Sequence, residues 1–239
     1  MGTVVSFLAD SNELAAPEVE EAINLACCDL HRIDEQFSTW KASSELSRWR
    51  NGEILEVSEL MDEVFGLCAH ACDVSKGFFD PWAMPGGFDP TGLVKGWAAE
   101  RALSILRRCG VTDALVNAGG DVCVAPGRTY RVGIRHPSFA DALCGVVEVG
   151  TSIATSGIYE RGDHLVNPFG GPIAAVSATV VGGRLAIADA LATALAIGGK
   201  EVLYLIEQLD GVEGFFITAA GGMFKSSGMK FSDLPEEQG

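Results

Sequence analysis

Apolar and polar positions alternate along this chain with two different periods, one typical of helices and one typical of strands. Apolar residues at helical spacing predict helices over 17–36, 57–75, 96–109, 185–197 and 199–209. Shorter runs bounded by Gly and Pro turns predict strands over 3–9, 113–117, 121–125, 129–135, 144–149, 176–181, 214–218 and 223–225. Ser58 is a typical cap for the second helix, and Gly110 ends the third. The pattern predicts an α+β fold, with helices packed on a largely antiparallel sheet.

The helix expected over 185–197 is unusual because it is apolar nearly all round. Ile187, Leu191 and Leu195 repeat at helical spacing and form one apolar stripe. The opposite face is mostly alanine, where a surface helix would carry lysine and glutamate. Both faces of this helix are therefore expected to be buried in the protein.

Two polar side chains, Asp189 and Thr193, interrupt this apolar helix and lie four residues apart, on one face. A buried carboxylate is costly unless a cation compensates it, and no Lys or Arg lies between Arg184 and Lys200. A hard metal ion held by Asp189 and Thr193 would supply the charge. Alternatively, Asp189 lies in the first turn beside free backbone amides, and Thr193 bonds a carbonyl one turn earlier. The residue pattern leaves both interpretations open.

Composition indicates the size of the core and the compartment. With 239 residues, 48% of them hydrophobic, the chain can form one large domain or two intimately packed lobes, with an acidic tail from about residue 233. No run approaches the ~20 apolar residues of a membrane span, and the first residues lack the basic region of a signal peptide. The seven cysteines are odd in number and form no CxxC pair, which is typical of reduced thiols. We therefore expect a cytoplasmic protein without a membrane span.

A formal net charge of -15 restricts the kinds of partner that the protein can have. The charge argues against nucleic acid and acidic membranes, whose phosphates it would repel. A substrate that contains phosphate would meet the same repulsion, so its site must carry local positive charge. A metal ion or a few well-placed Lys and Arg side chains would supply that charge.

The segment from Asp89 to Gly96 places an acid, a glycine turn and Lys95 directly before the helix expected at 96–109. Free amides and the helix dipole favour an anion at such a place. The spacing of a Walker loop is absent. An ordinary capped helix start with an exposed lysine would show the same residues, so an anion site is one of two interpretations.

Four more segments contain candidate functional residues. Aromatic side chains next to turns, at Trp40 and at Phe78 and Phe79, can hold a planar ring but are also typical of a core. Residues 117–121, Asn-Ala-Gly-Gly-Asp, indicate a tight turn between strands. His164 precedes a proline turn, where it can act as a general base or have a structural role.

Taken in order, these and other short segments make the chain resemble the ApbE-like FAD:protein FMN transferase family from residue 1 to about residue 220. The matching segments, in family order, are Met1-Gly-Thr3, Phe37-Ser-Thr-Trp40, Ser44-Glu-Leu-Ser47-Arg48, Gly77-Phe-Phe-Asp80-Pro81, Asp89-Pro-Thr-Gly-Leu-Val-Lys95-Gly96, Asn117-Ala-Gly-Gly120, Thr155-Ser-Gly157, His164-Leu-Val-Asn-Pro168 and Ala188-Asp-Ala-Leu-Ala-Thr193. Each segment is modest alone, and their combination is specific. The resemblance implies a single ApbE-like domain over residues 1–239.

The resemblance also implies an enzyme that modifies another protein. Such an enzyme moves FMN from FAD onto a Thr or Ser of an acceptor protein, a redox flavoprotein, through a phosphoester bond. AMP is released, and Mg²⁺ is required. Acceptors of this family carry an acid before a Ser-Gly-Ala-Thr-like run. The segment Thr155-Ser-Gly-Ile departs from that pattern, so the acceptor is expected to be a different protein.

By position, the resemblance assigns roles to individual residues. Asp189 and Thr193 would bind magnesium through their side chains, and Gly92 and Ala192 through backbone oxygens. His164 would be the base that takes the proton from the acceptor hydroxyl. The positions that would contact FAD are Met1, Trp40, Phe78, Phe79, Asp80, Asp89, Lys95 and Val166.

Two positions depart from the family pattern. Asn167 stands where the histidine motif commonly has Asp, and Arg50 stands where many members have Asn. The second position bears on whether bound FAD is kept for transfer or hydrolysed. Two alternatives therefore stay open: a magnesium-dependent FAD pyrophosphatase that gives FMN and AMP, and a non-catalytic flavin-binding protein.

Overall fold

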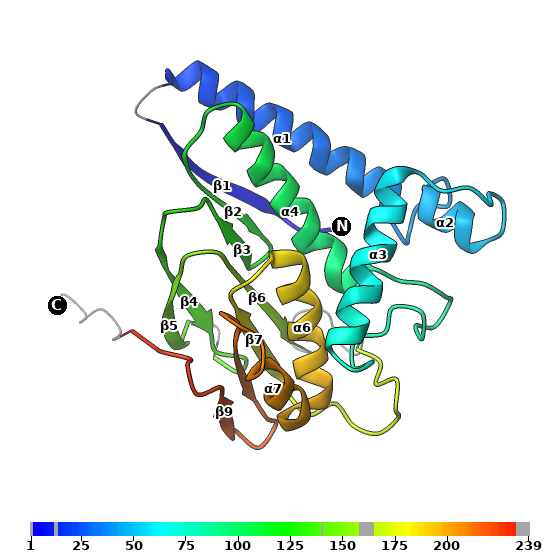
Figure 1. The fold of residues 1–239 in the computed structure, drawn as a ribbon, viewed down its shortest axis with the longest axis vertical. Coiled ribbons are helices and arrows are strands. Elements are labelled where there is room, and N and C mark those ends of the chain that lie inside the picture. Colours follow the sequence, from blue (N-terminus) through cyan, green and yellow to red (C-terminus); the bar gives the residue numbers. More distant parts are fainter. Residues whose placement is uncertain (1, 12–13, 140, 158–164, 233–239) are drawn as a thin grey trace.

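The computed structural model of the chain describes residues 2–11, 14–139, 141–157 and 165–232 (Figure 1). The helices in this part are α1 (Ala16–Phe37), α2 (Glu45–Arg50), α3 (Glu59–Val74), α4 (Thr91–Arg108), α6 (Leu185–Gly198) and α7 (Lys200–Ile206). The strands are β1 (Val5–Asp10), β2 (Asp113–Ala118), β3 (Asp121–Val124), β4 (Tyr130–Arg135), β5 (Leu143–Val149), β6 (Ser152–Gly157), β7 (Ser177–Val181), β8 (Glu213–Ile217) and β9 (Met223–Lys225).

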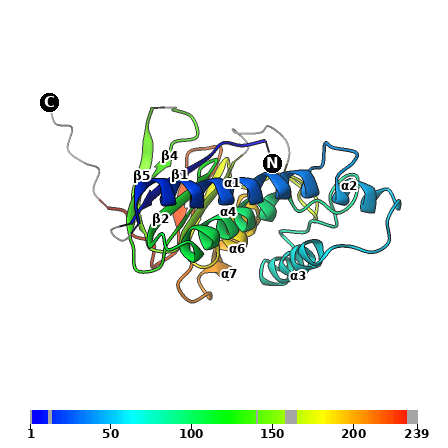
Figure 2. The ribbon, with the colours of Figure 1, turned by 90° about the horizontal axis from the view of Figure 1, so that it is seen from above.

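Seven strands form one antiparallel sheet in the order β1-β2-β3-β6-β7-β8-β9. Strands β4 and β5 form a separate two-stranded hairpin. The helices α1, α4 and α6 lie together on one face of the larger sheet (Figures 1 and 2). The fold is therefore α+β with antiparallel strands, which confirms the prediction from the sequence. No helix in the described residues is both long and apolar enough to cross a bilayer.

Alternation along the strands divides the interior into two apolar clusters. In β3, Val122 and Val124 pack toward the β4–β5 hairpin, whereas Cys123 packs toward the helices. Successive side chains of a strand point to opposite faces, so Asp121 shares the helix-covered face with Cys123. The candidate site forms on this face.

Helix α4 begins at Thr91 and not at Gly96, where the sequence pattern placed its start. Asp89 accepts a hydrogen bond of 3.0 Å from the amide of Thr91 and so closes the turn before the helix. The expectation was wrong because Gly92 and Gly96 have the character of turn residues. Packing explains one of these glycines, since a Cβ at Gly96 would lie 2.6 Å from the carbonyl oxygen of Leu185 in α6.

Most other elements agree with the sequence pattern, and two are absent from it. Ser58 caps α3 by accepting a hydrogen bond of 3.3 Å from the amide of Met61. The two-residue turn at Gly119 and Gly120, between β2 and β3, is the tight turn expected for 117–121. Helix α2 has six residues, too few to show a helical period. Strand β6 is mostly buried on both faces, so it lacks the alternation that marks a half-exposed strand.

Candidate functional site

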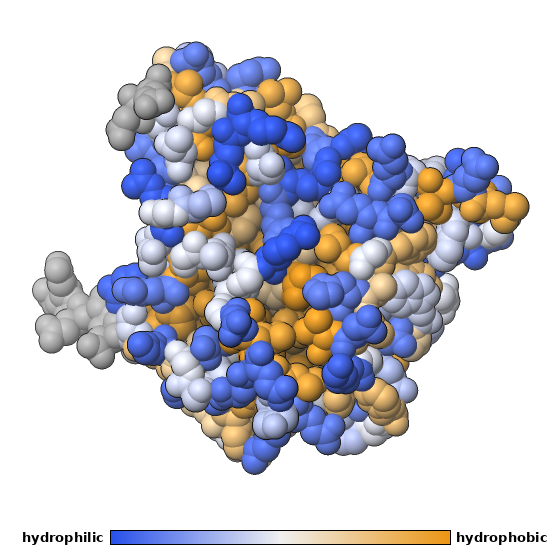
Figure 3. All heavy atoms as spheres, viewed as in Figure 1, coloured by the Kyte–Doolittle hydropathy of each residue, from blue (hydrophilic) through white to orange (hydrophobic). Residues whose placement is uncertain are grey.

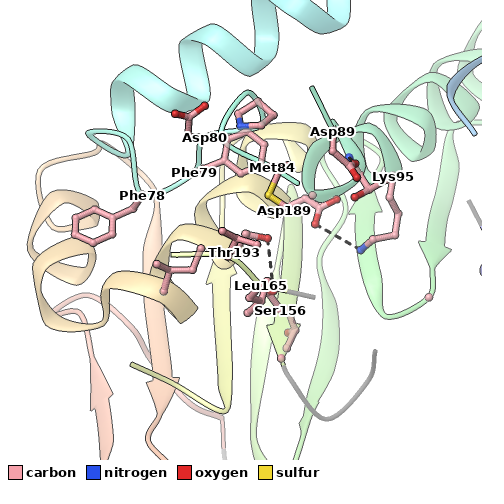
Figure 4. A pocket seen from close by; sticks show the side chains of 18 residues that line it. Phe78, Phe79, Asp80, Met84, Asp89, Lys95, Ser156, Leu165, Asp189 and Thr193 are labelled. Atoms are coloured by element: carbon pink, nitrogen blue, oxygen red, sulfur yellow. Dashed lines mark hydrogen bonds and ion pairs between the residues drawn. The ribbon is translucent and has the colours of Figure 1, made fainter. Parts of the chain in front are cut away.

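A pocket opens between α4, α6, the end of β6 and the loop that follows α3 (Figure 4). The cavity itself has a volume of about 80 Å³ and is open to solvent at its mouth. The site residues expected from the sequence that line this pocket are Phe78, Phe79, Asp80, Asp89, Gly92, Lys95, Val166, Asp189 and Thr193. The fold thus brings together residues from four separate segments of the chain.

Helix α6 supplies the two polar side chains that interrupt its apolar sequence. The helix is buried nearly all round. In the view of Figure 1, the molecular surface at the place of this helix is largely apolar (Figure 3). Asp189 is 4% exposed and lies in the second turn, so a role beside the free amides of the first turn is wrong. Its Oδ2 atom accepts a hydrogen bond of 3.2 Å from the backbone amide of Gly96 in α4. The hydroxyl of Thr193 donates to Ser156 Oγ at 3.5 Å, and not to a carbonyl one turn earlier.

A cation lies beside Asp189, and the neighbouring helix α4 supplies it. Lys95 forms an ion pair with Asp121 and a second one with Asp189, at 3.6 Å between Nζ and Oδ1. The side chains of Lys95, Asp121 and Asp189 are only 12%, 1% and 6% exposed, so little water shields these charges. Lys95 therefore lies inside a helix, with a largely buried side chain whose ammonium group is paired with carboxylates. This corrects both expectations for it, a free cation in front of the helix and an exposed surface lysine.

The pocket keeps an excess of negative charge. Lys95 offsets one of the two carboxylates of Asp121 and Asp189, and Asp80 and Asp89 also line the pocket. Nowhere in the described residues do three His, Cys, Asp or Glu side chains cluster as a metal site. A metal ion here would need hydroxyl or backbone oxygens as well, and such oxygen ligands suit Mg²⁺.

Gly92 leaves room beside Thr193. A Cβ at Gly92 would lie 3.2 Å from Thr193 Oγ1 and 3.2 Å from the ring of Phe79, so a larger side chain would fill the space in front of the hydroxyl. The carboxylate of Asp189 and the hydroxyl of Thr193 line the same pocket, and together they fit a small hard cation. Ala192 is fully buried in α6 and is not part of the pocket wall.

The two phenylalanines expected to hold a planar ring lie at different places in the pocket. Phe79 is 4% exposed and packs into the main core. Phe78 lies at the far end of the pocket from Lys95 (Figure 4). Its ring meets that of Phe169 edge-on, with 5.0 Å between the ring centres. The pocket therefore has a charged end and an aromatic end.

Two carboxylates and one guanidinium hold the loop between α3 and α4. Asp80 accepts a hydrogen bond of 2.9 Å from the amide of Trp82, and Asp89 accepts one at the start of α4. Arg50 of α2 donates two hydrogen bonds, of 2.9 and 2.7 Å, to the carbonyl oxygen of Gly86. These hydrogen bonds fix the loop that carries one wall of the pocket.

Two residues that hold the pocket together are not among those expected from the sequence. Asp121 accepts a hydrogen bond of 3.0 Å from the amide of Thr155 and ties β3 to β6. Ser156 lies in β6, the strand that the sequence pattern does not show. An acid directly after a Gly-Gly turn, at the start of a buried strand, is the one sequence signal that points to Asp121.

Comparison with known proteins decides the family. The model of the ApbE family matches residues 1–86 and 85–216, which together are most of the chain. This chain belongs to the ApbE family. Its curated relatives include the FAD:protein FMN transferases of Rhodobacter capsulatus, 35% identical over 158 residues, and of Escherichia coli strain K12, 30% identical over 155 residues. These matches cover 59% and 58% of this chain but 30% and 44% of the relatives, so they span less than half of those proteins.

Solved structures of ApbE proteins share the fold. The ApbE protein from Thermotoga maritima superposes with a TM-score of 0.80 at 22% identity, over 95% of this chain and 94% of that one. The flavin transferase ApbE from Vibrio cholerae gives a TM-score of 0.76 at 21% identity, over the same shares of the two chains, 95% and 94%. The arrangement of helices and sheet described above is therefore the ApbE fold.

The other positions expected to act in an ApbE protein lie outside the pocket or outside the described residues. Trp40 is 94% exposed between α1 and α2 and is not part of the pocket wall. Met1 and His164, expected to contact FAD and to act as the base, lie outside the described residues. Asn167 accepts a hydrogen bond of 3.0 Å from the amide of Phe169 and so closes the turn that follows the histidine motif.

Proposed function

We propose that this chain is a magnesium-dependent FAD:protein FMN transferase. It moves FMN from FAD onto a Thr or Ser of an acceptor protein and releases AMP. The observation that carries the proposal is the buried carboxylate of Asp189 beside Thr193, in a pocket with Lys95 at one end and Phe78 at the other. A ligand with a charged pyrophosphate and a planar ring system matches such a pocket. Membership of the ApbE family, whose relatives include named FAD:protein FMN transferases, supports the same activity.

Oxygen atoms on α4 and α6 would hold the magnesium ion. Asp189 and Thr193 would bind it through side chains, and Gly92 and Ala192 through backbone oxygens. When bound, Mg²⁺ would neutralise pyrophosphate oxygens and stabilise the charge that moves onto AMP. The excess of carboxylates over ammonium groups in the pocket supports this assignment, as does the room that Gly92 leaves beside Thr193.

The two ends of the pocket would orient FAD. Lys95 would attract the pyrophosphate, an interaction that matters in a protein whose net charge of -15 repels phosphate. Phe78 and Phe79 would offer flat apolar surface to a ring system. Asp80 and Asp89 would act by holding the loop that carries these aromatic residues, because both carboxylates bond to its backbone.

His164 would act as the general base of the transfer. It would take the proton from the acceptor hydroxyl as that oxygen attacks the phosphorus on the FMN side of the pyrophosphate. A new oxygen–phosphorus bond forms to FMN, and the bond from that phosphorus to the bridging oxygen breaks. AMP leaves with the bond electrons. Leu165 and Val166, the next residues in the sequence, line the pocket, which supports this assignment.

The proposal is tested by incubating the chain with FAD and Mg²⁺, with and without an acceptor. The acceptor is a redox protein that carries an acid before a Ser-Gly-Ala-Thr-like run. We expect AMP, and a fluorescent acceptor band on a denaturing gel, only when the acceptor is present. AMP without acceptor would indicate a pyrophosphatase, and flavin binding without AMP a carrier protein. Fluorescence on the band of this chain itself would contradict transfer to another protein.

A further inference from the structure

Lys95 lies between the carboxylates of Asp121 and Asp189 and can pair with either of them. The ion pair with Asp121 is the closer contact, whereas Asp189 Oδ1 lies 3.6 Å from the same Nζ atom. Both carboxylates are buried, so each attracts the ammonium group through a medium of low dielectric constant. The carboxylate that holds the lysine is compensated, and the other keeps its charge for a different cation.

Asp121 is fixed on its side of the lysine. It is the first residue of β3, directly after the two-residue turn at Gly119 and Gly120. Its Oδ1 atom accepts a hydrogen bond of 3.0 Å from the amide of Thr155, and its Oδ2 atom faces Lys95. Lys95, in contrast, carries its charge on a flexible four-carbon side chain. The carboxylate of Asp121 therefore determines where the ammonium group lies.

Asp189 uses its two oxygens differently. Oδ2 accepts the hydrogen bond of 3.2 Å from the amide of Gly96. Oδ1 faces Lys95 from 3.6 Å, which is beyond the usual length of an N–H···O hydrogen bond. That oxygen has lone pairs for another ligand. An ammonium group that moved onto Asp189 would occupy this position and cancel the charge.

We propose that Asp121 is a positioning residue that holds Lys95 away from Asp189 and so keeps Asp189 available to a divalent cation. The inference rests on the cation site of the proposed function. Neutralising Asp121 makes Asp189 the stronger partner for Lys95. The lysine then becomes a tethered competitor of the cation at the same carboxylate.

Asp121→Asn tests this role because asparagine keeps the shape of the side chain. Its amide oxygen can still accept the hydrogen bond from Thr155, while the charge is lost. The probe is Mn²⁺, titrated in the presence of FAD and without acceptor, with free Mn²⁺ measured by electron paramagnetic resonance. We expect the Kd for Mn²⁺ to rise by about 10- to 100-fold, as for other residues that orient metal ligands.

A second substitution separates this role from structural damage. Combining Asp121→Asn with Lys95→Met removes the competitor and should bring the Kd for Mn²⁺ back to that of Lys95→Met alone. Damage to the pocket would not be repaired in this way. Asp113→Asn is the matched control: Asp113 begins the neighbouring strand β2, bonds Tyr130 and Arg128 outside the pocket, and should leave the Kd unchanged.

The outcomes distinguish this inference from the proposed function. If the unsubstituted chain and Asp121→Asn bind Mn²⁺ with equal Kd, the role of Asp121 is overturned. The cation site of the proposed function then stands. Failure of Lys95→Met to restore binding in Asp121→Asn would overturn it as well. If neither the unsubstituted chain nor any of these variants binds Mn²⁺, the cation site of the proposed function is overturned, and this inference with it.

Discussion

The carboxylate of Asp189 in α6 is hydrogen-bonded to the backbone amide of Gly96 in α4, with 3.2 Å between nitrogen and oxygen. The two helices are in close contact at this point, because a Cβ at Gly96 would lie 2.6 Å from the carbonyl oxygen of Leu185. Lys95, the residue before Gly96, faces the same carboxylate. One stretch of α4 thus positions both the carboxylate and the ammonium group of the pocket.

Gly96→Ala should destabilise the fold. The added methyl group meets backbone that cannot move aside without separating α4 from α6, so we expect the free energy of unfolding to fall by roughly 1–3 kcal/mol. Chemical unfolding followed by circular dichroism measures this. Gly66→Ala in α3 is the control, because a Cβ there meets nothing within 4 Å, and it should stabilise the helix by about 0.5–1 kcal/mol. Equal stabilities of the two variants would contradict the close helix contact.

Asp189→Ala should abolish AMP release and also destabilise the protein. The amide of Gly96 loses the acceptor oxygen that Asp189 provides, and Lys95 loses one of its two carboxylates. Breaking a buried hydrogen bond costs roughly 1–3 kcal/mol, which unfolding in the absence of Mg²⁺ and FAD would measure. If Asp189 were a buried carboxylate without partners, Asp189→Ala would instead raise the free energy of unfolding. Unchanged turnover in Asp189→Ala would end the assignment of this residue to the magnesium site.

Thr193→Val should change the magnesium requirement with little effect on stability. Valine has nearly the same shape as threonine, and the hydrogen bond that it removes, to Ser156, is long at 3.5 Å. We expect the Mg²⁺ concentration for half-maximal activity to rise, because one oxygen ligand is lost. A magnesium titration at saturating FAD measures this shift, with thermal unfolding as the control. An unchanged titration curve would leave Thr193 with a packing role only.

His164→Ala should abolish transfer and leave FAD binding within a few-fold of the unsubstituted protein. A general base acts on the transition state more than on the bound substrate, and its loss typically costs a factor of about 10²–10⁴ in rate. Single-turnover transfer to the acceptor measures the rate, and quenching of flavin fluorescence measures binding. A variant that transfers FMN at the full rate would exclude His164 as the base.

The buried thiols should resist modification while the protein is folded. Burial raises the pKa of Cys68 well above that of a free thiol and raises the pKa of Cys123 to about 12, since a buried thiolate loses its hydration. Cys28 is exposed on α1. At pH 8 we expect a thiol-reactive dye to label Cys28 first, and Cys68 and Cys123 only after unfolding. If the rapid labelling of the folded chain is lost in Cys28→Ser, Cys28 is the thiol that reacts first. Rapid labelling of Cys68 in the folded chain would contradict its burial.

The parts of the fold that local pattern determines could be predicted from the sequence. Helix α6 is an example, because its composition already showed that Asp189 would be buried and would need compensation. The order of strands and turns likewise predicted the antiparallel sheet. In both cases the residues that carry the signal are neighbours in the chain.

The parts that depend on distant segments could not be predicted. In the sequence Gly96 has the character of a turn residue, and only the contact with Leu185 of α6 explains why it is a glycine. Nothing near Lys95 in the sequence indicates that Asp121 and Asp189 are its partners. The ammonium group that faces Asp189 comes from Lys95 in α4 and not from the helix that carries the carboxylate. The sequence pattern therefore lacks these contacts between elements, as well as the short helix α2 and the buried strand β6.

The order in which the pocket is completed follows from where its walls lie in the chain. The residues that line the pocket extend along the sequence from Phe78 to Ile197. Val5 of β1, likewise, can pair with Ala118 of β2 only after the ribosome has synthesised Ala118. During synthesis, a ribosome that has released only the residues before Leu185 has produced α4 with Lys95 but not the helix that carries Asp189. A nascent chain stalled there should therefore take up no flavin. Recognition of the dinucleotide would therefore begin only after α6 has left the ribosome.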